Sequence, residues 1–200
     1  MADYTAIYSV GNSIAQYLQN AYPPALASSF PCQFKLVSST EIALEGQTAL
    51  DQVVSIFLHR VTTNENFRNA TLLPDAPTKQ PAVFLDLHYL LTYWGTSAQA
   101  EQTILGWAVQ QLQSSPILDN SILLNASIPA SDKTWGATES VQLVMADLSL
   151  EDILRIWDAL GPKYRLSVAY LARVVRIDRS FAPAGPVVAT RFTLEQEPVS

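Results

Sequence analysis

A strand-like alternation from Val83 to Tyr93 is the feature that most limits how this chain folds. One face of this segment is wholly apolar or aromatic and consists of Val83, Leu85, Leu87, Tyr89, Leu91 and Tyr93. The other face is mixed and consists of Phe84, Asp86, His88, Leu90, Thr92 and Trp94. A period of two over this length predicts a long β-strand, and its apolar face must pack against other elements.

Periodicity predicts the other elements as well. Apolar residues at three- and four-residue steps predict a helix over 4–22, which Pro23 and Pro24 end. Alternation in 165–177 predicts another long strand, and its interruption between Arg173 and Arg176 predicts a bulge or the end of burial. Further strands are expected at 34–37, 52–62, 122–124 and 140–145, and irregular segments at 63–81 and 116–139.

Two more helices have sequence signals for their ends. Thr96 and Gln99 have the spacing of a capping box and predict a helix that stops before Pro116. Ser149 and Asp152 have the same spacing before a second helix. Gly161 lies where a C-terminal residue with positive φ is favoured, and Pro162 prevents the helix from continuing.

Strands and helices are interleaved, but without the regular alternation of a doubly wound sheet. This order predicts an α+β fold with a single mixed or antiparallel sheet of about four or five strands, packed by about three helices. Length allows one domain with an arm, which we place at 1–178 and 179–200. Val188, Phe192 and Leu194 alternate in the arm and predict a strand added to a partner's sheet. The alternatives are a strand folded back on its own domain, or a disordered tail.

Composition excludes several classes of function. Charged residues make up 15% of the 200 residues, against about 25% in typical domains, which indicates a surface partly covered by partners or simply rich in uncharged polar residues. The net charge of -6 argues against nonspecific nucleic-acid binding. A single cysteine, Cys32, cannot form an internal disulfide and fits a reducing cytoplasm. We see no signal peptide and no segment long enough for membrane insertion.

An enzyme is disfavoured by what the chain lacks. Asp86 and His88 are two residues apart, so they share a strand face, and such a pair can orient a general base. However, no nucleophile motif accompanies them, and a structural or interface role is the better interpretation. Cys32, His59 and His88 lack the spacing of metal ligands, and no phosphate-binding glycine loop is present, so no cofactor is expected.

Charge is segregated along the C-terminal half. The basic residues Lys163, Arg165, Arg173, Arg176 and Arg179 follow an acidic group made of Glu139, Asp147, Glu151, Asp152 and Asp158. Oppositely charged regions on one subunit favour head-to-tail docking of copies into a ring, although an ordinary solvated surface contains the same residue types. Trp135 lies in a polar loop and is expected to be an interface anchor, unless that loop folds against its own domain.

Two separated segments carry a family resemblance. Leu87–Trp94 with Leu105–Gly106 and Pro116–Leu118 form the first, and Leu148–Asp152 with Trp157–Leu160 and Tyr164–Tyr170 form the second. In order and spacing they resemble the N-terminal domain of tube-terminator or cap proteins of phage-tail-like contractile injection systems. The resemblance implies a tail-terminator-like fold and a non-enzymatic homohexameric ring. Its implied partners are the inner tube protein and the last layer of sheath protein.

The resemblance also implies a place for the protein. It is expected to assemble in the cytoplasm as part of a particle that is then released or held at a membrane. Two alternatives remain open at this point. One is an adaptor or chaperone-like protein that binds tube or sheath subunits, and the other is a small hydrolase that uses Asp86 and His88.

Overall fold

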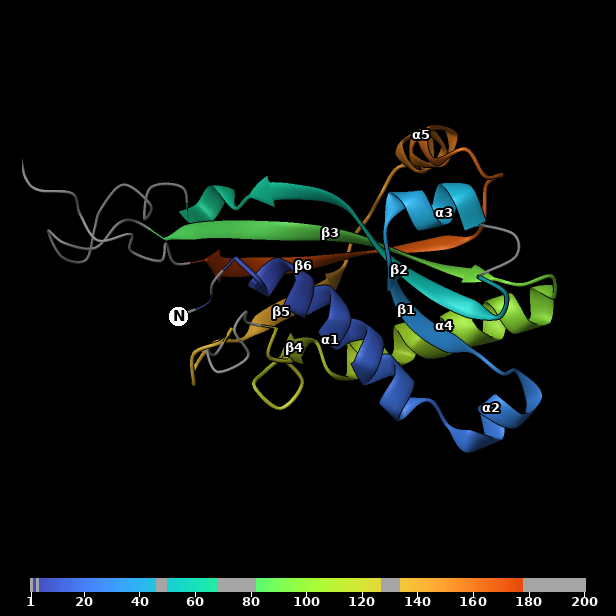
Figure 1. The fold of residues 1–200 in the computed structure, drawn as a ribbon, viewed down its shortest axis with the longest axis horizontal. Coiled ribbons are helices and arrows are strands. Elements are labelled where there is room, and N and C mark those ends of the chain that lie inside the picture. The colour runs from blue at the N-terminus through green and yellow to red at the C-terminus, as the bar shows by residue number, and fades with distance from the viewer. Residues whose placement is uncertain (1, 3, 46–49, 68–81, 127–133, 178–200) are drawn as a thin grey trace, which may run out of the picture.

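A computed structural model describes residues 2, 4–45, 50–67, 82–126 and 134–177, which form one six-stranded sheet with helices on both faces (Figure 1). The strands are β1 (Gln33–Val37), β2 (Val53–Thr63), β3 (Val83–Trp94), β4 (Ile117–Leu118), β5 (Val141–Met145) and β6 (Ser167–Ile177). The helices are α1 (Ala6–Ala21), α2 (Pro24–Ser29), α3 (Ser39–Glu45), α4 (Ala98–Ser114) and α5 (Leu150–Leu160), with a 3-10 turn η1 (Glu65–Phe67). None of these helices is long and apolar enough to cross a membrane.

The strand order is β1-β2-β3-β6-β5-β4, and only the β1–β2 pair is parallel. The predicted α+β class with one mixed sheet is therefore confirmed. The described residues contain more elements than expected, because α2, α3 and β4 were not predicted. Each of these three is too short to give a periodic pattern of its own.

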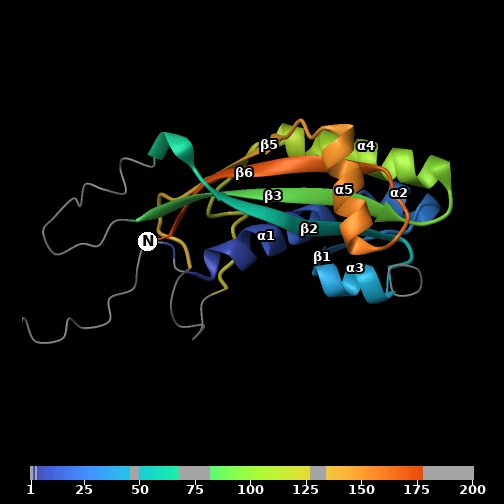
Figure 2. The ribbon, with the colours of Figure 1, turned by 90° about the horizontal axis from the view of Figure 1, so that it is seen from above.

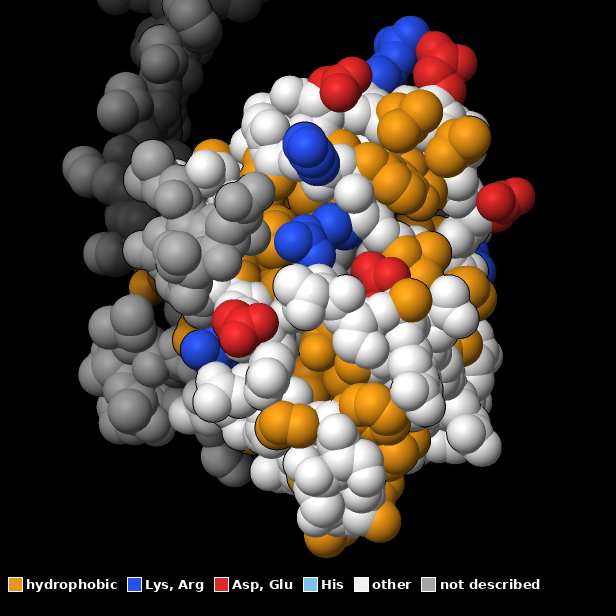
Figure 3. Space-filling view, turned by 90° about the vertical axis from the view of Figure 1, so that its right-hand side faces the viewer, with side chains coloured by type: hydrophobic (Ala, Val, Ile, Leu, Met, Phe, Trp, Pro, Cys, Tyr) orange, Lys and Arg blue, Asp and Glu red, His pale blue; other side chains and the backbone are white. Residues whose placement is uncertain are grey.

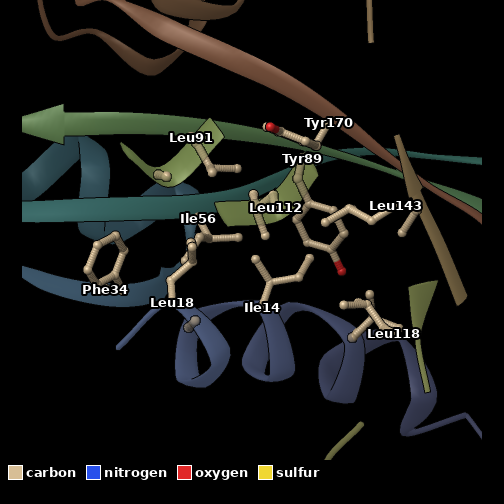
Figure 4. Close-up of a cluster of buried hydrophobic side chains, with 14 of the residues drawn as sticks. Ile14, Leu18, Phe34, Ile56, Tyr89, Leu91, Leu112, Leu118, Leu143 and Tyr170 are labelled. Carbon is tan, nitrogen blue, oxygen red and sulfur yellow. The ribbon is translucent and has the colours of Figure 1, made fainter. Parts of the chain in front are cut away.

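The larger core lies between one face of the sheet and the helices α1 and α4. The predicted stripe of α1 is confirmed, since Val10, Ile14 and Leu18 are fully buried there. They pack toward the apolar face of β3, where Leu87, Tyr89 and Leu91 are buried (Figure 4). Helix α4 contributes Ile104, Ala108 and Leu112. The apolar face of β3 thus holds this layer together.

On the opposite face of the sheet, the described helices α3 and α5 cover one end. Trp157 of α5 packs on Trp94 of β3, with ring centroids 5.8 Å apart. Leu90 and Ala169 complete this smaller core from the sheet side. Figure 2 looks down on this face: α5 crosses the strands near one end, and the rest of β2, β3 and β6 has no described helix in front of it.

Two irregularities alter the long strands. In β2 the register shifts between Leu58 and Arg60, and His59 lies in this bulge. In β6 the register with β3 shifts after Ala172, where Val174 has a φ of 61°. The bulge that the interrupted alternation between Arg173 and Arg176 predicted is therefore confirmed.

The helix ends confirm one prediction and correct another. At α5 the Ser149 hydroxyl accepts the Asp152 backbone N–H at 3.1 Å, and Gly161 closes the helix with a φ of 93°. At α4 the predicted pair of Thr96 and Gln99 is wrong. The N-cap is Ser97, whose hydroxyl accepts the Ala100 backbone N–H at 3.3 Å. Both residues can cap a helix, and the sequence pattern alone misplaced the helix start by one residue.

A predicted strand at 122–124 is also wrong. The backbone N–H groups of Ile122 and Leu123 both donate to the Asp119 carbonyl, at 3.0 and 2.8 Å. The Asp119 carboxylate in turn accepts the Ser121 N–H at 2.9 Å. Local bonds of an Asp side chain to the chain two residues on favour a turn over a strand. The apolar side chain of Leu123 is buried in the larger core from this turn.

Candidate interface surfaces

One half of the second sheet face forms a surface that we call the open face. It consists of side chains that share a face by strand pairing, namely Arg60 and Thr62 of β2, Phe84, Asp86 and His88 of β3, and Leu171, Arg173 and Arg176 of β6. His88 is two residues from the buried Leu90, so the open face begins where the smaller core ends. The structure brings together the predicted interface residues Arg173 and Arg176 and adds Arg60 to them.

Hydrogen bonds hold the polar centre of the open face. The Asp86 carboxylate accepts both from the Asn64 side-chain amide, at 2.9 and 3.0 Å, and from the Val174 backbone N–H at 3.0 Å. His88 Nε2 lies 3.0 Å from the Thr62 hydroxyl. Each member of the supposed acid–base pair is thus engaged with a neighbouring strand or loop. This arrangement supports the structural interpretation of Asp86 and His88.

The two histidines lie together at the edge of this face. The rings of His59 and His88 are 6.0 Å apart between centroids. Burial, with the nearby His88 and Arg60 charges, lowers the pKa of His59 to about 4. Burial also lowers the pKa of His88. Both rings are therefore neutral near pH 7, and the positive charge of the open face comes from its arginines.

A second surface is the solvent side of α5, which we call the α5 outer face. It consists of the exposed residues Leu150, Glu151, Asp152, Leu154, Arg155 and Asp158. Leu150 and Leu154 are 64% and 41% exposed, one helical turn apart. The Arg155 guanidinium pairs with the Glu151 carboxylate at 2.6 Å. With three carboxylates and one arginine, the α5 outer face has a net negative charge. In Figure 3, charged side chains at the top of the molecule border a group of hydrophobic ones.

The predicted interface residue Arg165 lies away from the other two arginines, at the end of the sheet. Its Nη1 donates to the Gly95 carbonyl at 3.1 Å, and its guanidinium carbon is 4.9 Å from the Trp94 ring centroid. Beside it is an open hollow of about 450 Å³, lined also by Glu101 and Tyr164. Arg165 therefore braces the chain between α5 and β6, at the opposite end of the β3–β6 pair from Arg173 and Arg176.

Trp135 has a role that its polar loop did not indicate. Its side chain is 8% exposed and belongs to the larger core. The indole N–H donates to the Ser9 hydroxyl of α1 at 2.6 Å. The Ser9 hydroxyl in turn donates to the Leu124 carbonyl. The loop therefore folds against its own domain, which is the alternative to the expected interface anchor.

Four predicted interface residues lie outside the described part of the chain, namely Arg179, Val188, Phe192 and Leu194. Within the described part, no group of three or more His, Cys, Asp or Glu side chains is placed to hold a metal ion. Cys32 is buried beside Phe34, and burial raises the pKa of its thiol to about 12. Its character as an inert apolar residue is thus supported.

Sequence reasoning missed two contributors to these surfaces. Arg60 joins the open face because it pairs with His88 across a bulge, and no sequence pattern gives that register. The exposed pair Leu150 and Leu154 carried no clear signal, because Leu150 has the helical spacing of Ile153 and Trp157, and only the packed structure shows that it is 64% exposed.

A family model matches most of this chain. Residues 9–190 match the family model of the Pvc16 N-terminal domain. The chain belongs to the Pvc16 N-terminal domain family. No curated protein shows a significant match. The fold is similar to two structures determined by electron cryomicroscopy. One is the sheath/tube terminator, in the extended state, of the extracellular contractile injection system PVC. The other is the tube-terminating cap of the anti-feeding prophage.

Both similarities are at the level of the fold. The PVC terminator is 18% identical with a TM-score of 0.54 over 99% of this chain, and the prophage cap is 16% identical with a TM-score of 0.52 over 94%. The match spans 66% of the first structure's chain and 59% of the second's. The described part of this Pvc16 N-terminal domain is a β1–β6 sheet with its larger core on one face and a smaller core under α5 on the other.

Proposed function

We propose that this protein is a structural subunit that caps the tube of a contractile injection system. The observation that carries the proposal is the family match over residues 9–190, supported by the fold shared with a sheath/tube terminator and a tube-terminating cap. Because the sequence identities are low and each match covers only part of the other chain, the role belongs to the proposal and not to the comparison.

The finer form of the proposal concerns assembly. Copies of the chain form a homohexameric ring on the distal end of the inner tube and engage the last sheath layer. Only 15% of the residues are charged, which supports extensive contact with protein partners. The arginines of the open face and the carboxylates of the α5 outer face give the chain two surfaces of opposite charge, which also favours such contact. Residues 1–178 form the capping domain, and residues 179–200 act as an arm toward a neighbour or the sheath. Assembly takes place in the cytoplasm.

A non-enzymatic role fits the geometry of the described residues. Asp86 is engaged by Asn64 and Val174, and His88 contacts Thr62, so both members of the best candidate pair already have structural partners. A general base must reach the proton that it removes, with a group to orient it. In the described part of the chain, no hydrogen bond joins His88 to Asp86.

Microscopy of particles tests this proposal. Particles from cells that lack this gene are compared with particles from the same cells carrying the wild-type gene on a plasmid. We expect tubes of uncontrolled length or tubes without a stable sheath in the deletion strain, and restoration by the plasmid. Particles of normal length with a normal end in the deletion strain contradict the capping role and favour the adaptor. Native mass spectrometry of the isolated cap then tests for six times the 22.0 kDa chain.

A further inference from the structure

The hollow beside Arg165 lies where β3 passes into α4 and where α5 leads into β6. It has a volume of about 450 Å³, and its lining includes the side chains of Trp94, Glu101, Lys163, Tyr164, Arg165 and Leu166. Figure 3 looks onto this end of the molecule, where basic and hydrophobic side chains lie next to each other. The smaller core accounts for the position of Trp94, but not for the charged and exposed side chains around it.

Arg165 is held in place at this hollow by its side chain and by its backbone. Its guanidinium carbon lies 4.9 Å from the Trp94 ring centroid, and its Nη1 donates to the Gly95 carbonyl at 3.1 Å. Its own carbonyl accepts the Ser167 hydroxyl at 2.9 Å, and that hydroxyl lies 2.8 Å from the Thr92 hydroxyl of β3. A guanidinium carries further N–H donors, which are left for a ligand. Because the group is already fixed, little side-chain entropy is lost when those donors bind.

The walls of the hollow are also rigid parts of the fold. The Trp94 indole N–H donates to the buried Ser55 hydroxyl at 2.8 Å, and the Trp94 ring packs on Trp157. On the other side Gly161, with a φ of 93°, ends α5, and Pro162 follows with the fixed φ of its ring. The hollow is therefore formed before any ligand enters it.

The charges around the hollow leave a positive excess. Lys163 and Arg165 line it with a single carboxylate, Glu101. Neither Lys163 nor Glu101 forms an ion pair with a described residue. One bound carboxylate balances this set of charges, with two positive and two negative groups. A polyanion is disfavoured, because the whole chain has a net charge of -6.

Exposed apolar side chains adjoin these charges. Tyr164 and Leu166 flank Arg165 in the chain, line the same hollow, and are 48% and 40% exposed. Tyrosine and arginine are enriched at contacts between proteins, where an aromatic ring supplies apolar area and a guanidinium supplies directed hydrogen bonds. The ligand that fits this hollow therefore has an apolar group next to its carboxylate.

We propose that this hollow binds an acidic peptide segment of a different protein in the particle. Arg165 donates its remaining N–H groups to one carboxylate of that segment, and Lys163 adds a second positive charge. An apolar side chain beside the carboxylate packs on Tyr164 and Leu166. Glu101 weakens the attraction, since it places a like charge near the bound carboxylate. The location of the partner in the particle rests on the proposed capping function, whereas the binding of a carboxylate does not.

Titration of the purified full chain tests the carboxylate site. The probe is 3-phenylpropionate, which joins a carboxylate to an apolar ring, and the control is its neutral amide, 3-phenylpropanamide. Nuclear magnetic resonance of the Trp94 indole N–H and the Arg165 Nε–H follows binding. We expect saturable shifts with the carboxylate and at least about ten-fold weaker binding of the amide. Absence of saturable shifts, or equal binding of the two probes, overturns the proposal.

Substitutions in the hollow give the titration a sign as well as a size. Arg165→Gln and Lys163→Gln should weaken probe binding about ten-fold and about three-fold. Glu101→Gln should strengthen it about three-fold, because a like charge is removed. Lys35→Gln, on the exposed side of β1, is the matched control and should leave binding unchanged. The Lys163 and Glu101 variants keep the test decisive if Arg165→Gln does not fold, and weaker binding by Glu101→Gln contradicts the site.

Charge reversal in whole particles tests the partner. Lys163→Glu should lower the recovery of the chain per particle about ten-fold, with Lys35→Glu as the control that keeps wild-type recovery. Wild-type recovery of Lys163→Glu overturns the contact. Loss of self-association of the purified chain in Lys163→Glu overturns the separate partner, because the ligand is then a second copy. If the wild-type chain is absent from the particles, the capping function fails while the titration still decides the carboxylate site, so the two failures are distinguishable.

Discussion

The carboxylate of Asp86 on β3 accepts the backbone N–H of Val174 on β6, at 3.0 Å, where the two strands fall out of register. Val174 has a φ of 61°, which a β-branched residue adopts at a cost of about 1–2 kcal/mol. The hydrogen bond offsets part of that cost, and it also fixes the bulge that sets the position of Arg173. The open face thus depends on a carboxylate that the sequence presents as a catalytic candidate.

Replacement of Asp86 tests this link between the bulge and stability. Asp86→Ala removes the acceptor for Val174 and for the Asn64 amide, and it should lower the free energy of unfolding by about 1–2 kcal/mol. Asp86→Asn keeps one acceptor oxygen and should cost less. Urea denaturation followed by circular dichroism measures both. Equal losses for the two variants contradict the role of the acceptor oxygen.

Ser9 connects the loop of Trp135 to α1. Its buried hydroxyl accepts the indole N–H and donates to the Leu124 carbonyl. Ser9→Ala leaves both groups unpaired and should lower the free energy of unfolding by about 2–4 kcal/mol. Ser28→Ala is the control, because that exposed hydroxyl bonds only to Pro24 within its own helix, and it should stay within about 0.5 kcal/mol. A Ser9 variant as stable as the control argues against this buried relay.

His59 makes stability depend on pH in a defined direction. Its pKa is about 4 in the folded protein, below the ordinary histidine value of 6.5 that applies in the unfolded chain. The unfolded chain therefore binds an extra proton between these values, so stability is full above pH 6.5 and falls as the pH drops toward 4. His59→Gln should show a shallower loss than the wild type in this window. Parallel curves from pH 7.5 to 4.5 contradict the assignment to His59.

Two adjacent residues with hydroxyl side chains, Thr96 and Ser97, are candidates for the N-cap of α4, and substitution distinguishes between them. Ser97→Ala removes the observed cap and should lower the free energy of unfolding by about 1 kcal/mol. Thr96→Ala, at the position that the sequence pattern favoured, should change it by less than about 0.5 kcal/mol. Thermal unfolding of both variants decides between the positions. A larger effect at Thr96 restores the original prediction.

Much of the framework was predictable because long elements repeat their pattern many times. The stripe Val10, Ile14 and Leu18 and the alternation in 83–93 each identified an element and its buried face. A bulge was also predictable, from the interrupted alternation near Arg173. What escaped prediction were short elements such as α3, whose few residues give no period.

The surfaces were harder to predict than the framework, for a physical reason. Trp135 was misassigned because its burial depends on Ser9, a residue far away in sequence. Arg60 was missed because strand register across a bulge is a tertiary property. Arg173 and Arg176 were identified as charged neighbours, but only the sheet places them on one face, the face whose other end is covered by α5.

Location within the particle tests the central claim most directly. An affinity tag added to this chain and labelled with gold is imaged on intact particles, with an untagged strain as the background control. The capping account predicts gold at one end of each particle, at the tip of the tube and sheath. Gold along the sheath, at random positions, or absent from particles that contain tube and sheath contradicts it.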